Sequence, residues 1–375
     1  MTANEQALYE ELYELIANSA ATYNNAVQAQ LDIWEGRIPK AHPLILHCNL
    51  PQDIDKRFPN YHPGETHNDR VKMLLNGMKS MLNATFAGAG AVPSIRANMG
   101  CGIIPSLFPG VMPLLFDDGK MPWVKAHLSR DEISQLREKD IAITDEFKMA
   151  LEHMAYIAEH IQGTGAYVFP VDIQGPFDVA HLVFGDQIFY AMYDEPDLVH
   201  HLLELSCYAT ELGYAECLKL MPNSDNVIAH YNSIIIPASR GGIKLSEDTT
   251  TIISPAQVDE FAIPYTQRIL DFAGGGYIHY CGRNDHLFKR CQKMNNAYGI
   301  NFGNPEMHDM EDILRQTSHA GKIYYGNVPM NEHESHRDYF KRIKKAATAH
   351  GKCPLLLSYW TDYEKKDEII VAWNK

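Results

Sequence analysis

The chain has 375 residues, 45% hydrophobic and 21% charged, which is typical of a globular protein and excludes disorder over most of its length. The net charge is 33 − 47 = −14, and no long basic run occurs, so we expect no nucleic-acid partner. The start lacks the features of a secretory signal, the longest apolar stretch contains three prolines, and the seven cysteines are scattered. We therefore expect a cytoplasmic protein with no membrane association.

The N-terminal part of the chain predicts helices separated by loops. Helical periodicity covers residues 8–16 and 66–85, whereas the proline-rich residues 38–64 predict a loop with one short apolar run. Residues 86–123 are rich in Gly and Pro and are expected to wrap over other elements. We expect residues 1–90 to form a helical extension packed on the remainder of the chain.

From about residue 125 onward, helical stretches alternate with short apolar runs. The runs lack strict polar alternation, which is typical of parallel strands buried on both faces. Repeated βα units without a Gly-rich phosphate loop favour an α/β protein with a (β/α)8 barrel over a dinucleotide-binding fold. We interpret residues 1–375 as a single barrel domain. Strands are expected at residues 167–170, 227–230, 277–280, 300–302, 323–325 and 355–358.

The expected strand ends supply the candidate site residues, because active sites of such barrels lie at the carboxyl ends of the strands. Three residues are candidates for catalysis, namely Asp172, His230 and Glu306. Four are candidates for binding a small-molecule substrate, namely Gln174, Asn232, Asp248 and Asn327. Structural roles remain open for them: the Glu247-Asp248 pair could form a turn, and Glu306 could cap the following helix.

His279-Tyr280-Cys281 is the sharpest chemical signal. Residues i and i+2 of a strand point to the same face, so the imidazole of His279 and the sulfur of Cys281 are expected to converge. Both groups are good zinc ligands, and Glu306, just past the next strand, is a candidate further ligand. The alternative is a hydrogen-bonded pocket histidine beside a buried thiol.

Four segments of the chain resemble the uroporphyrinogen decarboxylase superfamily. They are Gln174-Gly-Pro-Phe-Asp-Val-Ala180, Ser254-Pro255 through Pro264-Tyr265, His279-Tyr-Cys-Gly282 and Gly326-Asn-Val328. The resemblance implies a (β/α)8 barrel and one of two chemistries. One is metal-free decarboxylation of a porphyrin precursor, and the other is zinc-dependent methyl transfer from a methylated corrinoid to a thiol.

The chain departs from both branches of the superfamily. The methyltransferase branch has a His-Xaa-Cys pair, which His279 and Cys281 match, and a further Cys at the end of the last strand. Here the last apolar run is followed by Tyr359-Trp360, and Cys353 precedes the run and is expected at the opposite end of the barrel. The Arg-rich N-terminal motif of the decarboxylases has no clear counterpart. The chain therefore resembles a divergent branch.

Three hypotheses follow. The leading one is zinc-dependent methyl transfer from a methylated corrinoid to a thiol or tetrahydrofolate, with His279 and Cys281 as ligands and a corrinoid protein as a candidate partner. The second is a metal-free carboxy-lyase for a tetrapyrrole or an aromatic acid, in which Asp172 stabilises a protonated pyrrole. It requires a positively lined pocket that the scattered arginines do not obviously supply. The third is a corrinoid- or tetrapyrrole-binding protein without turnover.

Overall fold

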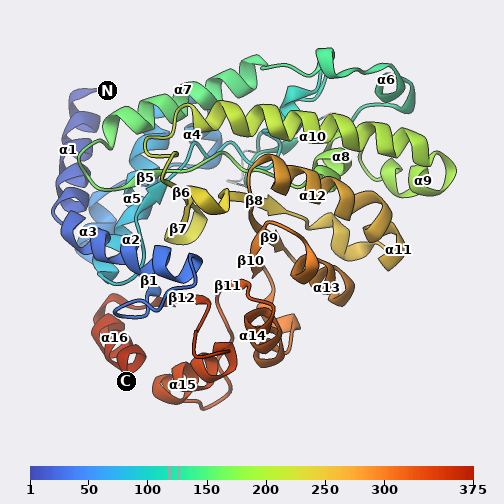
Figure 1. The fold of residues 1–375 in the computed structure, drawn as a ribbon. Helices are drawn as coiled ribbons and strands as arrows, with labels where there is room; N and C mark the ends of the chain where they lie inside the picture. Colours follow the sequence, from blue (N-terminus) through green and yellow to red (C-terminus); the bar gives the residue numbers. More distant parts are fainter. Residues whose placement is uncertain (117–119, 126) are drawn as a thin grey trace.

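Parallel strands lie at the centre of the molecule, and helices cover them on the outside (Figure 1). The computed structural model describes residues 1–116, 120–125 and 127–375. The strands are β1 Leu44–Cys48, β2 Ser94–Ile95, β3 Pro113–Leu114, β4 Trp123–Val124, β5 Tyr167–Val168, β6 Val227–His230, β7 Ile234–Pro237, β8 Ile243–Ser246, β9 Gly276–Tyr280, β10 Ala297–Phe302, β11 Ile323–Gly326 and β12 Leu355–Thr361.

Sixteen α-helices are present in the described residues, and none is long and apolar enough to cross a membrane. The helices are α1 Ala3–Ala17, α2 Ala20–Trp34, α3 Gln52–Arg57, α4 Pro63–Asn68, α5 Arg70–Ala87, α6 Arg130–Gln135, α7 Asp145–His160, α8 Pro176–Phe184, α9 Gln187–Asp194, α10 Pro196–Leu218, α11 Pro255–Gln257, α12 Ile263–Phe272, α13 Asp285–Lys293, α14 Met310–His319, α15 His336–Ala347 and α16 Lys366–Asn374.

The strands form the α/β barrel that the sequence predicts. Six parallel strands pair in the order β1-β12-β11-β10-β9-β8, so the first strand joins the last, with Leu44 opposite Leu357. On the other side, β5 pairs with β2, and the segment after β5 reaches β8 through a parallel bridge between Gln174 and Ser246. Eight strands thus follow one another in chain order around the barrel: β1, β2, β5 and β8 to β12.

Three barrel strands, β1, β2 and β8, were missed from the sequence, and one predicted strand is not a wall strand. β1 lies in the proline-rich segment expected to be a loop, so residues 1–90 are not a purely helical extension. β8 was also missed, because its four residues mix buried and half-buried side chains. Residues 227–230 do form a strand, β6, but it pairs antiparallel with β7 in a hairpin instead of joining the parallel sheet.

The β6–β7 hairpin fills part of the barrel interior. Ile234 and Ile236 of β7 belong to one buried cluster with Tyr277, Tyr325 and Leu356, which come from three wall strands. Asn232 and Ser233 form the turn with φ of 59° and 63°, the left-handed conformation that tight hairpins need. The Tyr325 hydroxyl donates a 3.2 Å hydrogen bond to the carbonyl of Tyr231, which fixes the hairpin tip inside the barrel.

Candidate functional site

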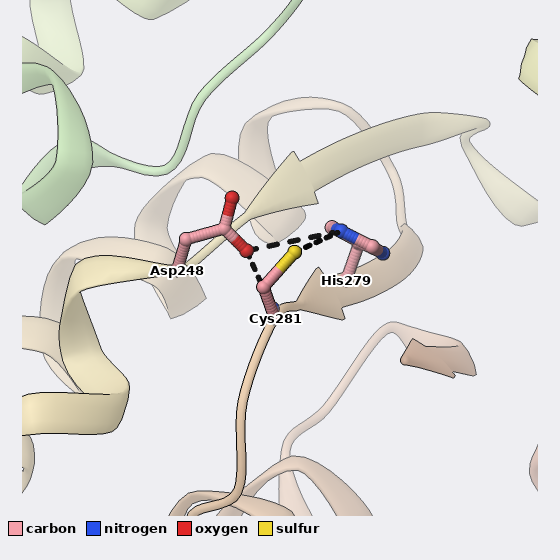
Figure 2. Close-up of side chains that lie close together, drawn as sticks. All are labelled: Asp248, His279 and Cys281. Atoms are coloured by element: carbon pink, nitrogen blue, oxygen red, sulfur yellow. Dashed lines mark hydrogen bonds and ion pairs between the residues drawn. The ribbon is translucent and has the colours of Figure 1, made fainter. Parts of the chain in front are cut away.

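Three potential metal ligands converge at the carboxyl ends of β8 and β9 (Figure 2). His279 points inward from β9, and Cys281 follows two residues later, so both side chains lie on the same side as the sequence predicts. The His279 Nε2 and Cys281 Sγ atoms are 3.6 Å apart. Asp248, just after β8, places Oδ1 3.8 Å from the same Nε2. All three ligand atoms lie within 4.8 Å of one another.

Asn301 on β10 fixes the tautomer of His279. The Asn301 amide nitrogen donates a hydrogen bond to the carbonyl of Tyr325, so its Oδ1 faces Nδ1 of His279 and must accept a proton from it. The imidazole proton therefore sits on Nδ1, and Nε2 keeps its lone pair toward Cys281 and Asp248. Metal-bound histidines are held in this way in many proteins.

The loop that carries Asp248 is held by a buried carboxyl group on α8. Asp178 accepts hydrogen bonds from the backbone N–H groups of Asp248 and Thr249, at 2.7 and 2.8 Å. Burial and the nearby charge of Asp248 raise the pKa of Asp178 to about 7. Asp248 in turn accepts a 2.6 Å hydrogen bond from the backbone N–H of Cys281. These contacts tie the ends of β8 and β9 together.

Space for the sulfur of Cys281 depends on a glycine. A Cβ atom added to Gly303, just after β10, would lie 2.4 Å from the Cys281 Sγ, much closer than real contacts allow. The backbone at Gly303 also donates a 2.9 Å hydrogen bond to the carbonyl of Tyr280, so it cannot easily move away. Gly303 therefore leaves the sulfur in the position that faces His279.

The electrostatics of the three donors suit a bound divalent cation. Burial lowers the pKa of His279, as does the charge of Lys244, so the imidazole is neutral and able to act as a ligand. Burial and the Asp248 carboxylate raise the pKa of the Cys281 thiol to about 11. A cation would relieve this unfavourable pairing of sulfur and carboxylate. The 3.6 Å separation also fits a tetrahedral zinc site, where Zn–N and Zn–S distances of about 2.0–2.3 Å place two ligands about 3.5–4 Å apart.

A cavity of about 480 Å³ lies beside the donors, at the carboxyl end of the barrel. Asp172 lines it, and the Oδ1 atom of this residue lies 3.3 Å from Nη1 of Arg96 and 3.3 Å from Nζ of Lys244. Aromatic side chains form part of its wall. The aromatic rings that line it belong to Phe169, Tyr214, Tyr231, Tyr277, Phe302, Tyr325 and Trp360.

Most of the predicted site residues meet around this cavity. Those lining it are Asp172, His230, Asn232, His279 and Asn327. His230 is fully surrounded by protein, burial lowers its pKa to about 3, and its Nε2 hydrogen-bonds the carbonyl of Gly242. This contact ties the end of β6 to the segment just before β8, and the lowered pKa leaves the imidazole neutral near pH 7.

The structure corrects the expected positions of three residues, Glu306, Asp248 and Gln174. Glu306 is exposed in a 3₁₀-helix after β10, where its carboxylate accepts a 2.8 Å hydrogen bond from Asn304, so it does not join His279 and Cys281. Asp248, expected to contact substrate, instead lies beside His279 and Cys281, at the position expected for Glu306. Gln174 is buried at the bridge to β8 and is not among the residues that line the cavity. Cys353 precedes β12 and lines a different cavity, as expected.

Sequence reasoning missed Arg96, Lys244 and Asn301. Lys244 and Ser246 alternate with buried Ile243 and Leu245 along β8, a period-2 pattern that could have identified the strand and its inward face. Asn301 lies inside an expected strand, but only the pairing of β10 with β9 shows that it lies opposite His279. Arg96 follows a two-residue strand in a Gly/Pro-rich segment, which offers no such signal.

The run of parallel strands, with polar side chains and potential metal ligands gathered at their carboxyl ends, defines an α/β barrel with an enzyme-like site. The sequence model of the uroporphyrinogen decarboxylase (URO-D) family matches residues 110–332, more than half of the chain, and the chain belongs to this family. A similar solved structure is a methyltransferase from Methanosarcina mazei, with a TM-score of 0.64 and 12% identity, covering 93% of this chain and 98% of that one. At this identity the similarity establishes the fold. No curated protein matches the chain.

Proposed function

We propose that this protein is a zinc-dependent methyltransferase that passes a methyl group from a methylated corrinoid to a thiol or to tetrahydrofolate. The observation that carries the proposal is the convergence of Asp248 Oδ1, His279 Nε2 and Cys281 Sγ within 4.8 Å of one another beside the cavity. The methyltransferase fold neighbour and the family support a chemistry of this kind. A corrinoid protein is the partner that would deliver the methyl donor.

In this proposal Asp248, His279 and Cys281 hold the zinc and leave the fourth position open for a ligand. Bound zinc would lower the pKa of a coordinated thiol, so that a thiolate is present at neutral pH. Asn301 keeps the His279 lone pair directed at the metal, and Asp178 holds the loop of Asp248 in place. The aromatic side chains that line part of the cavity offer apolar surface to the bound substrate.

The test is metal content after zinc loading and removal of excess metal. We expect one zinc per chain in the unaltered protein, and a loss in His279→Ala and Cys281→Ala, whereas Cys353→Ser, at the other cavity, keeps its zinc. Glu306→Gln also keeps its zinc, because its carboxylate lies outside the donor group. Stoichiometric zinc in the Cys281 variant, or none in the unaltered protein, would refute the zinc site.

A metal-free carboxy-lyase is the second candidate, and one observation favours it. The cavity holds a carboxylate, Asp172, kept ionised by Arg96 and Lys244, so the positive lining that the sequence did not reveal is present. An ionised carboxylate of this kind can stabilise a protonated pyrrole. Release of CO2 from a tetrapyrrole by chelator-treated protein, unaffected by Cys281→Ala, would establish this chemistry in place of methyl transfer.

A further inference from the structure

A second cavity, of about 440 Å³, lies at the amino end of the barrel, opposite the candidate metal ligands. Several of its lining residues come directly before a wall strand or in its first residues, namely His42 before β1, Tyr298 in β10, Ile323 in β11 and Pro354 before β12. No described residue lines both this cavity and the main one. Active sites of α/β barrels lie at the carboxyl ends of the strands, so this cavity is separate from the candidate active site.

The lining of this second cavity contains lysine and arginine without matching carboxylates. Its members of these types are Arg37, Arg240 and Lys352, and no Asp or Glu is among the described lining residues. Arg37 is neutralised by ion pairs with Asp32 and Glu35, which lie outside the lining. Arg240 and Lys352 have no carboxylate partner in the part of the chain that the structure describes. Two uncompensated cations therefore line one cavity, in a protein whose net charge is −14.

Arg240 is held in place without using its hydrogen-bond donors. Its guanidinium carbon lies over the ring of Tyr298, 4.5 Å from the ring centroid. The Tyr298 ring is fixed in turn, because its hydroxyl donates a 3.1 Å hydrogen bond to Asn296 and a Cβ added at Gly275 would lie 2.3 Å from the ring. The five N–H groups of the guanidinium have no acceptor among the described residues. A partly buried guanidinium ordered in this way loses little conformational freedom when it binds an anion.

Lys352 is positioned by a tight turn between α15 and β12. Ala349 and Lys352 exchange two backbone hydrogen bonds, at 2.9 and 3.0 Å. His350 and Gly351 between them have φ of 52° and 75°, as a two-residue turn of type I′ requires. The Lys352 ammonium reaches across to Gly36 of the lining, since a Cβ added at Gly36 would lie 3.7 Å from Nζ. The turn therefore fixes the backbone from which this ammonium extends over the cavity.

Further hydrogen-bond donors and an apolar surface complete the lining of the second cavity. The rings of His319 and His350 meet edge to face, with centroids 5.6 Å apart, and neither has a hydrogen-bond partner among the described residues. The indole N–H of Trp34 is buried and has no described partner either. Ile38 and Pro39 add apolar surface, and the Ile38 side chain is exposed. A ligand in this cavity thus meets donors for an oxyanion and apolar contacts for an organic body.

We propose that the second cavity binds a small organic phosphate, with the phosphate group between Arg240 and Lys352 and the organic body against Trp34 and Ile38. A phosphate monoester carries close to two negative charges near neutral pH, which matches the two uncompensated cations. Its three terminal oxygens can accept hydrogen bonds from a guanidinium and an ammonium together, whereas a carboxylate offers one charge and two oxygens. The volume of about 440 Å³ suits a small organic molecule. The site does not rest on the proposed function, because it shares no described residue with the main cavity.

The test measures binding of 1-naphthyl phosphate by isothermal titration calorimetry, with 1-naphthol and inorganic phosphate as the two halves of the probe. Chelator-treated protein is used, so that phosphate cannot bind a metal at the other end of the barrel. We expect 1-naphthyl phosphate to bind at least about tenfold more tightly than either half, which corresponds to ~1.4 kcal/mol. Arg240→Met should weaken its binding by about tenfold or more, because a charge-assisted hydrogen bond is lost. Lys352→Met, at an exposed ammonium, should weaken it by about threefold.

Two matched controls keep the same change of charge outside this cavity. Arg70→Met removes another arginine that lies over a tyrosine ring, 4.6 Å from the centroid of Tyr156, and Lys289→Met removes an exposed lysine of α13. Neither residue belongs to the lining of the second cavity, so each variant should change the affinity for 1-naphthyl phosphate by less than about twofold.

A third variant separates this site from the main cavity. Lys244→Met, in the main cavity, should leave the affinity for 1-naphthyl phosphate unchanged. Lost binding in Lys244→Met with full binding in Arg240→Met would place the probe in the main cavity and overturn the proposal. Equal binding of 1-naphthyl phosphate and 1-naphthol would also overturn it, as would undiminished binding in Lys352→Met, whose exposed side chain can be replaced without loss of the fold.

Discussion

The side-chain oxygen of Asn301 accepts the Nδ1 proton of His279, while the amide nitrogen of Asn301 is held by the carbonyl of Tyr325. Contacts from β10 and β11 therefore determine that Nε2 of His279, on β9, faces Cys281 and Asp248. This arrangement links the strand register to the metal-binding capacity of the site, since a histidine with its proton on Nε2 could not bind a metal through that atom.

Replacing Asn301 should weaken zinc binding without removing a ligand. In Asn301→Leu the Nδ1 group loses its acceptor, and the imidazole is free to rotate or to adopt the other tautomer. Substitutions at such supporting positions cost about 10–100-fold in metal affinity. Competition titration with a chromophoric chelator measures the change. Asn304→Leu, whose side chain contacts Gly282 and Glu306, is the control and should change zinc affinity by less than about threefold. Unchanged affinity in Asn301→Leu would show that Asn301 does not orient His279.

Adding a methyl group at Gly303 should displace the Cys281 sulfur. A Cβ there would lie 2.4 Å from Sγ, so Gly303→Ala forces the thiol into another rotamer, away from His279. We expect zinc affinity to fall by about tenfold or more while the melting temperature changes little, because a single exposed side chain absorbs the clash. Gly64→Ala is the matched control, because a Cβ added at Gly64 would lie 3.7 Å from the nearest atom, an ordinary contact distance. Gly321 is unsuitable as a control because its φ is positive.

The reactivity of Cys281 should depend on its carboxylate neighbour. Burial and Asp248 raise the pKa of the thiol to about 11, so in chelator-treated protein at pH 7.5 we expect slow alkylation by iodoacetamide. Asp248→Asn removes the negative charge and should accelerate alkylation severalfold at the same pH. Peptide mass spectrometry follows Cys281 separately from the other cysteines. A slower reaction in the variant would contradict the electrostatic coupling.

Acid should destabilise the fold through a buried histidine of β1. Burial lowers the pKa of His47 to about 4, against 6.5 in the unfolded chain, and its Nε2 lies 3.0 Å from the Ser233 hydroxyl. Its contribution to stability is complete above pH 6.5 and is lost as the pH falls toward 4, because the unfolded state then binds the extra proton. We expect His47→Gln to reduce the loss of unfolding free energy between pH 7 and pH 4.5 by about 2 kcal/mol, measured by urea denaturation. An identical loss in both proteins would contradict this assignment.

The sequence predicted those parts of the site that depend on local geometry. Period-2 alternation placed His279 and Cys281 on one side of the chain, and the strand runs placed both at the carboxyl end of a barrel. The sequence could not predict that Asp248 lies beside His279 and Cys281, because the position of its loop is set by Asp178 on α8, seventy residues earlier in the chain. The cluster of Arg96, Asp172 and Lys244 depends likewise on three chain segments, at β2, β5 and β8, that meet only when the barrel forms.

The misassigned strand has a similar physical origin. The run Val227–His230 is short and buried, as in a wall strand, and the turn that follows is built from Asn232 and Ser233 without a glycine. All four residues of each hairpin strand are buried, so the strands lack the polar alternation that marks a surface hairpin. Burial pattern alone cannot separate such a hairpin from a parallel strand.

The most direct test of the central claim is X-ray absorption spectroscopy of the zinc-loaded protein at the zinc edge. The proposed site predicts one sulfur at about 2.3 Å and nitrogen or oxygen neighbours at about 2.0–2.1 Å, with an imidazole scattering pattern from His279. In Cys281→Ala the sulfur shell should disappear, whereas in Cys353→Ser it should persist. A shell of nitrogen and oxygen only in the unaltered protein, or a sulfur shell that survives the loss of Cys281, would contradict a zinc site formed by Asp248, His279 and Cys281.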